Sequence, residues 1–182
     1  MKKLSLFMFV VLMSFGLSAC DVPFIDEQIA DEEEVVIDDE AVVGEVVEPE
    51  TMTVNLYYYN LEADKEIAEY IPCSGDAVLP VEREIPVVEN VPEYTLNELL
   101  KGQINIPEAV DGFQTEFAPG KLELKSLTIK DGVATVEFLD DKGFTSGGSC
   151  RTGLLASQIQ KTLLQFPEIT KVEFANEEMF QP

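Results

Sequence analysis

The residues best suited to nucleophilic chemistry lie in a glycine-rich stretch, Gly147-Gly148-Ser149, just before a helical pattern. Free amides before a helix can bind an anion, and the hydroxyl of Ser149 can be imagined as a nucleophile. A serine nucleophile needs a base, and the chain has no histidine. A lysine base would have to be Lys142 or Lys161, which no motif supports. The preferred interpretation is a glycine-rich turn in which Ser149 caps the helix.

Paired carboxylates are the second chemical possibility. Asp140 and Asp141 are adjacent, and such a pair can serve a wall glycosidase or bind Ca²⁺. In a chain with 35 acidic residues, however, neighbouring carboxylates are expected by chance, and no calcium-loop signature surrounds them. The absence of histidine also removes the commonest general base and metal ligand. We predict no catalytic residue, no metal site and no cofactor.

The third candidate is the thiol of Cys20. Lys2 and Lys3 precede an apolar run, and the segment closes with Leu17-Ser18-Ala19-Cys20, which is typical of a secretory signal. A cysteine directly after a small pair resembles the bacterial lipobox, in which the thiol receives a diacylglycerol and the preceding peptide is removed. We therefore predict a signal peptide over residues 1–19 and a lipid anchor at Cys20 on the extracytoplasmic side of the membrane. The alternative is a plain signal with a coincidental cysteine.

Residues 21–50 contain thirteen acidic residues and no basic one. A run of like charge does not collapse into a core, so residues 20–50 are predicted to form a disordered tether that ends in the lipid. Its charge repels anionic headgroups, so the lipid must supply the membrane affinity. An acidic bait for a basic partner is the alternative.

Residues 51–182 have the length of one ordinary domain. They carry 22 acidic and 10 basic residues, which excludes nucleic acid as a partner because phosphate binding needs a basic surface. Two cysteines remain here, Cys73 and Cys150. An even pair in an exported domain favours a disulfide. The alternatives are two free thiols or a redox pair, although redox motifs favour closer spacing.

Strands are predicted over residues 53–59 and 78–85. In the first, Val54, Leu56 and Tyr58 share one face, while Tyr57 and Tyr59 on the other form either an exposed binding ladder or a packed surface. Pro80 and Pro86 confine the second strand to a sheet edge or to a short length. Arg83 shares its parity with apolar neighbours. It either pairs with a carboxylate across the sheet or marks a docking surface for an acidic partner.

The remaining pattern predicts a helix that begins at the capping box Thr95-Leu96-Asn97-Glu98 and stops at Gly102. Residues 104–119 are predicted to be a loop. Asp131-Gly132 joins the alternating residues on either side of it into a hairpin that pairs Ile129 with Ala134. A long helix follows from about Cys150 to Phe166, and a last strand covers residues 170–175. The order β-β-α-β-β-α-β predicts an α+β domain, with two helices packed on one face of a mixed or mainly antiparallel sheet.

Several of these segments together resemble the GerMN domain, which is named after a spore-germination protein and occurs in bacterial envelope lipoproteins. The most specific are the hairpin Asp131–Phe138 and the helix segment Gln158–Phe166; others are Pro80-Val81-Glu82-Arg83 and Gly147-Gly148-Ser149-Cys150-Arg151. The resemblance covers nearly all of residues 51–182. One departure is Lys101-Gly102-Gln103, where relatives often carry a Gly-Pro step.

The resemblance implies a small domain similar to the ring-building folds of sporulation and secretion assemblies. It also implies that Cys73 pairs with Cys150, and a noncatalytic role in envelope or cell-wall-related complexes. Two hypotheses follow. The favoured one is a lipid-anchored interaction or scaffold module that binds an envelope protein or itself through sheet edges or its helical face. The alternative is an envelope enzyme or a protein that binds a small ligand or peptidoglycan.

Overall fold

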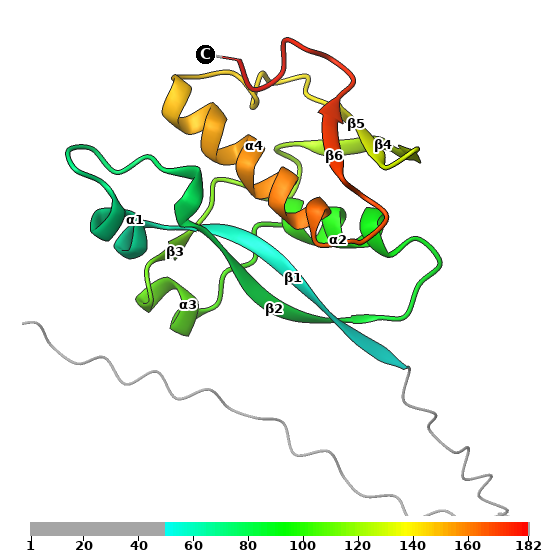
Figure 1. Ribbon diagram of the computed structural model, residues 1–182, viewed down its shortest axis with the longest axis horizontal. Coiled ribbons are helices and arrows are strands. Elements are labelled where there is room, and N and C mark those ends of the chain that lie inside the picture. The colour runs from blue at the N-terminus through cyan, green and yellow to red at the C-terminus, as the bar shows by residue number, and fades with distance from the viewer. Residues whose placement is uncertain (1–49, 182) are drawn as a thin grey trace, which may run out of the picture. The chain divides into compact units, whose positions relative to one another are not determined.

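The computed structural model describes residues 50–181, so the predicted signal peptide, the Cys20 anchor and the tether up to residue 49 lie outside the described residues. The α+β class is confirmed (Figure 1). In chain order the elements are β1 (Thr51–Asn60), α1 (Leu61–Ile67), the 3₁₀ helix η1 (Gly75–Ala77), β2 (Val78–Pro86), α2 (Val91–Leu100), α3 (Ile106–Val110), β3 (Phe113–Gln114), β4 (Glu123–Lys130), β5 (Val133–Leu139), α4 (Ser149–Leu164) and β6 (Lys171–Phe174).

The strands form two three-stranded sheets rather than one. The first has the order β2-β1-β3 and is antiparallel, and the second has the order β4-β5-β6, with β5 and β6 parallel. Helices α2 and α4 lie between the sheets and contact strands of both (Figure 1). The prediction that two helices cover one face of a single sheet is therefore wrong in this respect.

The sheets stay separate because side chains of α4 occupy the edge of β1 that faces away from β2. The amide of Asn55 donates to Gln165 Oε1 at 2.8 Å, and Gln165 Nε2 donates back to the Asn55 carbonyl at 2.7 Å. The amide of Tyr57 donates to Thr162 Oγ1 at 3.0 Å. The carboxamide of Gln165 thus replaces a neighbouring strand, and most of β1 pairs only with β2 on its other side.

Strand β2 is an edge strand, as its prolines predicted. The amides of Asn55 and Tyr57 point away from β2, so their partners Glu82 and Pro80 point their own backbone groups outward. Pro86, opposite Thr51, follows the same alternation. Both prolines therefore stand where β1 requires no N–H donor, and they blunt this edge against pairing with another chain.

The predicted hairpin is confirmed in turn and register. Asp131 and Gly132 have φ angles of 51° and 83°, and Ile129 lies opposite Ala134. Positive φ at both central residues is what a type I′ turn requires. The long helix and the final strand are also confirmed, with bounds shifted by one or two residues at each end.

Helix α2 begins earlier than predicted. Its N-cap is Asn90, which accepts a bond from the Glu93 amide at 3.3 Å, so Thr95 is an interior, buried helical residue rather than a cap. Pro92 fits this start because the first helical turn needs no amide donors from within the helix. The predicted stop is confirmed: Gly102 has a φ of 62°, and a Cβ there would lie 1.8 Å from the Phe117 carbonyl oxygen.

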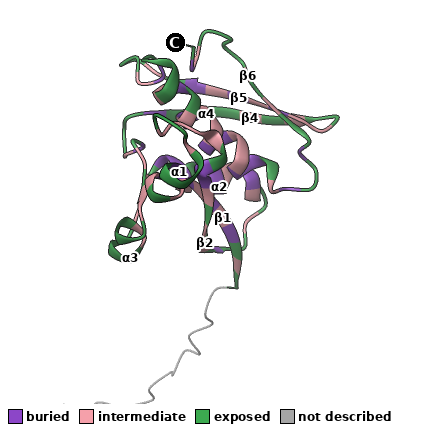
Figure 2. Cartoon of the chain, turned by 60° about the vertical axis from the view of Figure 1, so that its left-hand side comes forward, coloured by how far each residue is buried: buried purple, intermediate pink, exposed green. Residues whose placement is uncertain are grey.

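Three short elements occupy segments where only connections were predicted: α1, α3 and β3. The core lies between the two sheets and is built from both of them and from α2 and α4 (Figure 2). Its largest fully buried apolar side chains are Leu56, Tyr58, Leu96, Leu99, Leu155, Ile159, Leu163 and Val136. Among residues 50–181, no helix is both long and apolar enough to cross a membrane.

Candidate functional site

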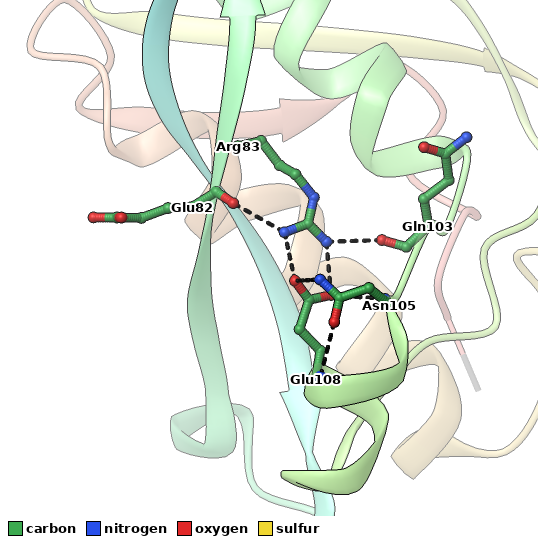
Figure 3. Close-up of polar contacts among 5 residues, drawn as sticks. All are labelled: Glu82, Arg83, Gln103, Asn105 and Glu108. Carbon is green, nitrogen blue, oxygen red and sulfur yellow. Dashed lines mark hydrogen bonds and ion pairs between the residues drawn. The ribbon is translucent and has the colours of Figure 1, made fainter.

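The most developed polar site of the described chain surrounds Arg83, the one polar residue that the sequence pattern singled out. The side chain of Arg83 leaves the edge strand β2 and reaches helix α3 (Figure 3). Nη1 and Nη2 each donate to one carboxylate oxygen of Glu108, both at 2.7 Å. The same two nitrogens donate to the carbonyls of Glu82 and Gln103, both at 2.9 Å. This is a two-pronged ion pair fixed by two further bonds.

The capping box of α3 completes the site. The Glu108 amide donates to Asn105 Oδ1 at 2.9 Å, and the Asn105 amide donates to Glu108 Oε2 at 3.0 Å. The bond from Arg83 holds the pKa of Glu108 below its usual value, against the opposing effect of burial. Glu108 in turn raises the pKa of Arg83. The geometry is that of the structural pair, one of the two roles predicted for Arg83.

The structure joins Cys73 to Cys150 through a disulfide, with Cα atoms 5.6 Å apart. Beside it lies the buried carboxylate of Asp64, which no motif or pattern in the sequence indicates. Asp64 accepts from the hydroxyl of Tyr59 at 2.7 Å and from the amide of Ser74 at 2.9 Å. These bonds fasten the segment between β1 and β2 near the bridge.

The tyrosines opposite the core face of β1 pack rather than form an exposed ladder. Tyr59 is buried against Ala77 and Val78, and Tyr57 packs against the same cluster. Burial, together with the bond to Asp64, raises the pKa of Tyr59 to about 12. Its hydroxyl therefore stays protonated and acts as a donor.

The glycine-rich stretch does not bring a base to Ser149. Ser149 is the first residue of α4, and the N-cap is Gly148, without a side-chain bond, so the prediction that Ser149 caps the helix is wrong. Lys161 lies twelve residues further along, roughly 18 Å along the axis, and its amine donates to the Val78 carbonyl at 2.9 Å. Lys142 donates to the Gly120 carbonyl at 3.4 Å.

The two adjacent aspartates have different surroundings. Asp140 accepts from the Phe144 amide at 2.6 Å and from the amide and hydroxyl of Thr145 at 2.8 and 2.7 Å, whereas Asp141 is exposed. Burial raises the pKa of Asp140, but the bonds from Thr145 and Phe144 outweigh it and the pKa is lowered. Asp140 thus shapes a loop. Within residues 50–181, no group of three or more histidine, cysteine or carboxylate side chains could hold a metal ion.

A second arginine with several partners is Arg151, which the sequence indicated only as the last residue of the motif Gly147-Gly148-Ser149-Cys150-Arg151. Nε donates to Glu116 at 2.7 Å, and Nη1 donates to the carbonyls of Phe144 and Ser146 at 2.7 and 2.8 Å. The guanidinium carbon also lies 4.9 Å from the centre of the Phe144 ring. Arg151 thus ties the loop before α4 to that helix, and it borders a small cavity of about 140 Å³.

Among the comparisons with known proteins, a family model matches most of the folded domain. A family model described as "Germane: Sporulation and spore germination" matches residues 55–178, which is more than half of the chain. No curated protein sequence matches the chain.

Three solved structures are similar to the chain, each with low sequence identity. The tandem GerMN domains of the sporulation protein GerM from Bacillus subtilis are 22% identical, with 75% of this chain and 42% of that chain covered and a TM-score of 0.47. The first GerMN domain of the same protein is 16% identical, with coverage of 70% and 84% and a TM-score of 0.43. A protein from Clostridium perfringens, described as a presumed lipoprotein, is 20% identical, with coverage of 71% and 76% and a TM-score of 0.36. The chain thus spans less than half the length of the tandem structure.

Proposed function

Because the chain belongs to the Germane, or GerMN, family of sporulation and spore-germination domains, we propose that it is a lipid-anchored envelope protein whose folded domain is a noncatalytic interaction or scaffold module. It would act in envelope or wall-associated assemblies of the sporulation type. The observation that carries the proposal is the match of the family model to nearly the whole folded domain. In this proposal, the exposed surface of the domain binds an envelope protein or a second copy of the chain.

The envelope location is supported by two cysteine features at different places in the chain. Leu17-Ser18-Ala19-Cys20 supplies a lipidation motif after an apolar signal. The disulfide between Cys73 and Cys150 fits an oxidising compartment outside the cytoplasm. A Cys20→Ala variant should lack the diacylglycerol and retain its uncleaved signal peptide, which an intact mass would detect. A wild-type mass without a diacylglycerol at Cys20, or the same processed N-terminus in the wild type and the variant, would contradict the anchor.

The interaction role is tested by affinity capture of the tagged full-length protein from crosslinked native envelopes. We expect reproducible recovery of one discrete envelope protein, or of a second copy of the chain. Arg83→Ala and Cys73→Ser variants serve as controls for the integrity of the fold. If all three proteins recover only the background, the scaffold proposal fails.

A second candidate, the binding of a wall fragment or another small ligand, is favoured by one observation. The cavity of about 140 Å³ lies between α4 and the segment after β3, and Arg151, Glu116 and Gln158 are among its lining residues. This volume suits only a small group. A rise in melting temperature with peptidoglycan fragments, lost in Glu116→Ala, would support this candidate, and turnover of such fragments would support an envelope enzyme.

A further inference from the structure

Strand β4 has backbone groups along one edge that no other part of the described chain uses. It is the outer strand of the sheet β4-β5-β6 and pairs only with β5. The carbonyl of Val136 in β5 accepts from the Ala175 amide at 2.9 Å, so Val136 directs its backbone groups toward β6. Ala134, two residues earlier in β5, does the same because the directions alternate along a strand. Leu127 and Ile129 lie opposite these two residues, so their own backbone groups point away from β5.

These outward groups give β4 an edge at which a further strand can bind. Within residues 50–181, the amides and carbonyls of Leu127 and Ile129 have no hydrogen-bond partner. Their side chains are half-buried, whereas those of Ala134 and Val136 on the central strand are fully buried. In Figure 2, the end of the hairpin formed by β4 and β5 extends beyond the helices. A strand added here would bond to this backbone and cover two half-buried apolar side chains.

The other edges of the two sheets are closed or short. Pro80 and Pro86 blunt β2. The side of β1 that faces away from β2 is bonded to Thr162 and Gln165, and β3 and β6 have only two and four residues. In β4, residues 126–130 form an uninterrupted stretch without proline, between a bulge at one end and the hairpin turn at the other. Strand β4 is therefore the edge best suited to accept another strand.

We propose that the β4 edge, meaning the outward backbone of Leu127 and Ile129 with the side chains of residues 125–131, pairs with the β4 edge of a second copy of the chain. The two strands run antiparallel across a twofold axis at Thr128, and the two three-stranded sheets become one continuous sheet. Each copy thereby fills the edge of the other, so the contact closes as a dimer. The inference rests on the interaction role proposed above and names its surface and its partner.

The side chains select one register for this pairing. With Leu127 opposite itself, Ile129 meets the second copy's Lys125, and with Ile129 opposite itself, Leu127 meets the second copy's Asp131. With Leu127 opposite Ile129, the apolar side chains meet each other on one face of the sheet. Thr128 then lies opposite Thr128 on the other face, and Lys125 comes level with Asp131. This register alone pairs apolar with apolar side chains and opposite charges with one another.

Charge favours a second copy over other occupants. Residues 123–131 contain two acidic and two basic residues, so the β4 edge is locally neutral in a domain that is acidic as a whole. Two such edges meet without net repulsion at the contact, and salt screens charges that lie more than about 8 Å apart. The chain's own residues 21–50 have thirteen acidic residues and no basic one, so they would leave Glu123 and Asp131 unmatched. The β4 edge is complementary to itself.

The test is disulfide trapping of the full-length protein in native envelopes. One pair of strands is a small interface, and anchoring two copies on one membrane, as proposed above, raises their local concentration. In the chosen register the Cα atoms of the two Thr128 residues lie about 4.5 Å apart, within reach of a disulfide. Thr128→Cys should therefore give a covalent homodimer on mild oxidation, identified by its mass. The matched control is Ser126→Cys, exposed on the same strand, whose two copies lie roughly 13 Å apart and should give about a tenfold lower yield.

A second variant tests the backbone pairing itself. The amide of Leu127 has no partner within residues 50–181, so Leu127→Pro in the Thr128→Cys background removes a donor that only the second copy uses. We expect the dimer yield to fall about tenfold, because the twofold axis doubles the loss. Leu127→Val, which keeps the amide, should retain the yield. Circular dichroism checks that both variants are folded, and if Leu127→Pro is not, the comparison of positions 128 and 126 decides.

Other results would overturn pairing through the β4 edge. These are the absence of a homodimer at position 128, equal yields at positions 126 and 128, the trapping of a different protein instead, and equal yields from folded Leu127→Pro and Leu127→Val. Affinity capture with the wild type separates this failure from that of the proposed function. If position 128 gives no dimer but capture recovers an envelope protein or a second copy, the interaction role stands and the surface is elsewhere. If the wild type captures nothing, the proposed function itself fails.

Discussion

Arg83 shows how one residue can look misplaced in a sequence and be satisfied in the fold. It shares the inner parity of β2 with Val81 and Ile85, where a charge would ordinarily be costly. Its length lets the guanidinium reach past the sheet edge to Glu108, whose planar carboxylate matches its geometry. Lysine, with a single ammonium, cannot reproduce this two-pronged contact.

Replacing Arg83→Ala should lower the free energy of unfolding by about 1–3 kcal/mol, because Glu108 would remain partly buried without its partner. Arg83→Lys should recover only part of the loss. The measurement is urea denaturation followed by circular dichroism. Lys65→Ala is the matched control, since Lys65 also pairs with a glutamate but is well exposed, and its loss should change little. Unchanged stability of Arg83→Ala together with lost partner capture would instead assign Arg83 to docking.

The same ion pair predicts a dependence on pH. The pKa of Glu108 is lower in the folded chain than its ordinary value of about 4.3. The contribution of the ion pair to the free energy of unfolding is therefore fully present when the pH lies above the ordinary pKa of a glutamate. This contribution is lost as the pH falls through the lower pKa that Glu108 has in the folded chain. The stability difference between the wild type and Glu108→Gln should be largest near neutrality and should shrink on acidification below about pH 4. A difference that stays constant down to pH 2 would contradict this assignment.

At the level of elements, the sequence predicted what is periodic or has specific turn chemistry. The Asp131-Gly132 hairpin and α4 follow from such signals, and the prolines of β2 correctly predicted a sheet edge. Helix α3 was missed because five residues carry no helical period. A usable signal did exist, because α2 and α3 begin with the same pattern of Asn, an aliphatic residue, Pro and Glu. The two segments are Asn90-Val91-Pro92-Glu93 and Asn105-Ile106-Pro107-Glu108.

The rest of the site depends on contacts between distant segments, which a local pattern cannot supply. Nothing in the sequence near Arg83 indicates that its partner lies 25 residues away in a capping box. Likewise, no local signal shows that Gln165 bonds to the backbone of Asn55, 110 residues earlier. This bond takes the place of a neighbouring strand along most of one edge of β1, so the division into two sheets could not be predicted from strand patterns.

Removing this contact should destabilise the fold. Gln165→Ala leaves the amide and carbonyl of Asn55 without their partners, so we expect a loss of about 1–3 kcal/mol in unfolding free energy. Gln165→Glu keeps the acceptor but places a carboxylate against the Asn55 carbonyl, and it should be no better than alanine. Gln160→Ala, on the same helix and without a side-chain hydrogen bond among the described contacts, is the control. Equal stability of the Gln165 and Gln160 variants would show that water replaces the strand-like contact.

For the molecule as a whole, α4 is the element that joins distant parts of the chain. It contacts both sheets, bonds to β1 through Thr162 and Gln165, and holds the Val78 carbonyl through Lys161. The disulfide adds a covalent link near its first turn, to Cys73 in the segment between β1 and β2. The bridge therefore fixes the end of α4 that is farthest from the Gln165 contact.

Loss of the disulfide should accordingly lower the stability of the whole fold and expose the segment between α1 and η1 to proteolysis. Closing a loop across a separation of 77 residues stabilises by about 4.5 kcal/mol in the chain-entropy model, so reduction, or Cys73→Ser with Cys150→Ser, should cost about 2–5 kcal/mol. Tyr70 and Ile71 are already exposed beside the bridge, and cleavage by chymotrypsin should begin at Tyr70 in the reduced protein. Urea denaturation with and without reductant, together with mass mapping of the first cut, checks both effects. Equal midpoints in the two conditions would mean that the contacts of α4 hold this end of the fold without the disulfide.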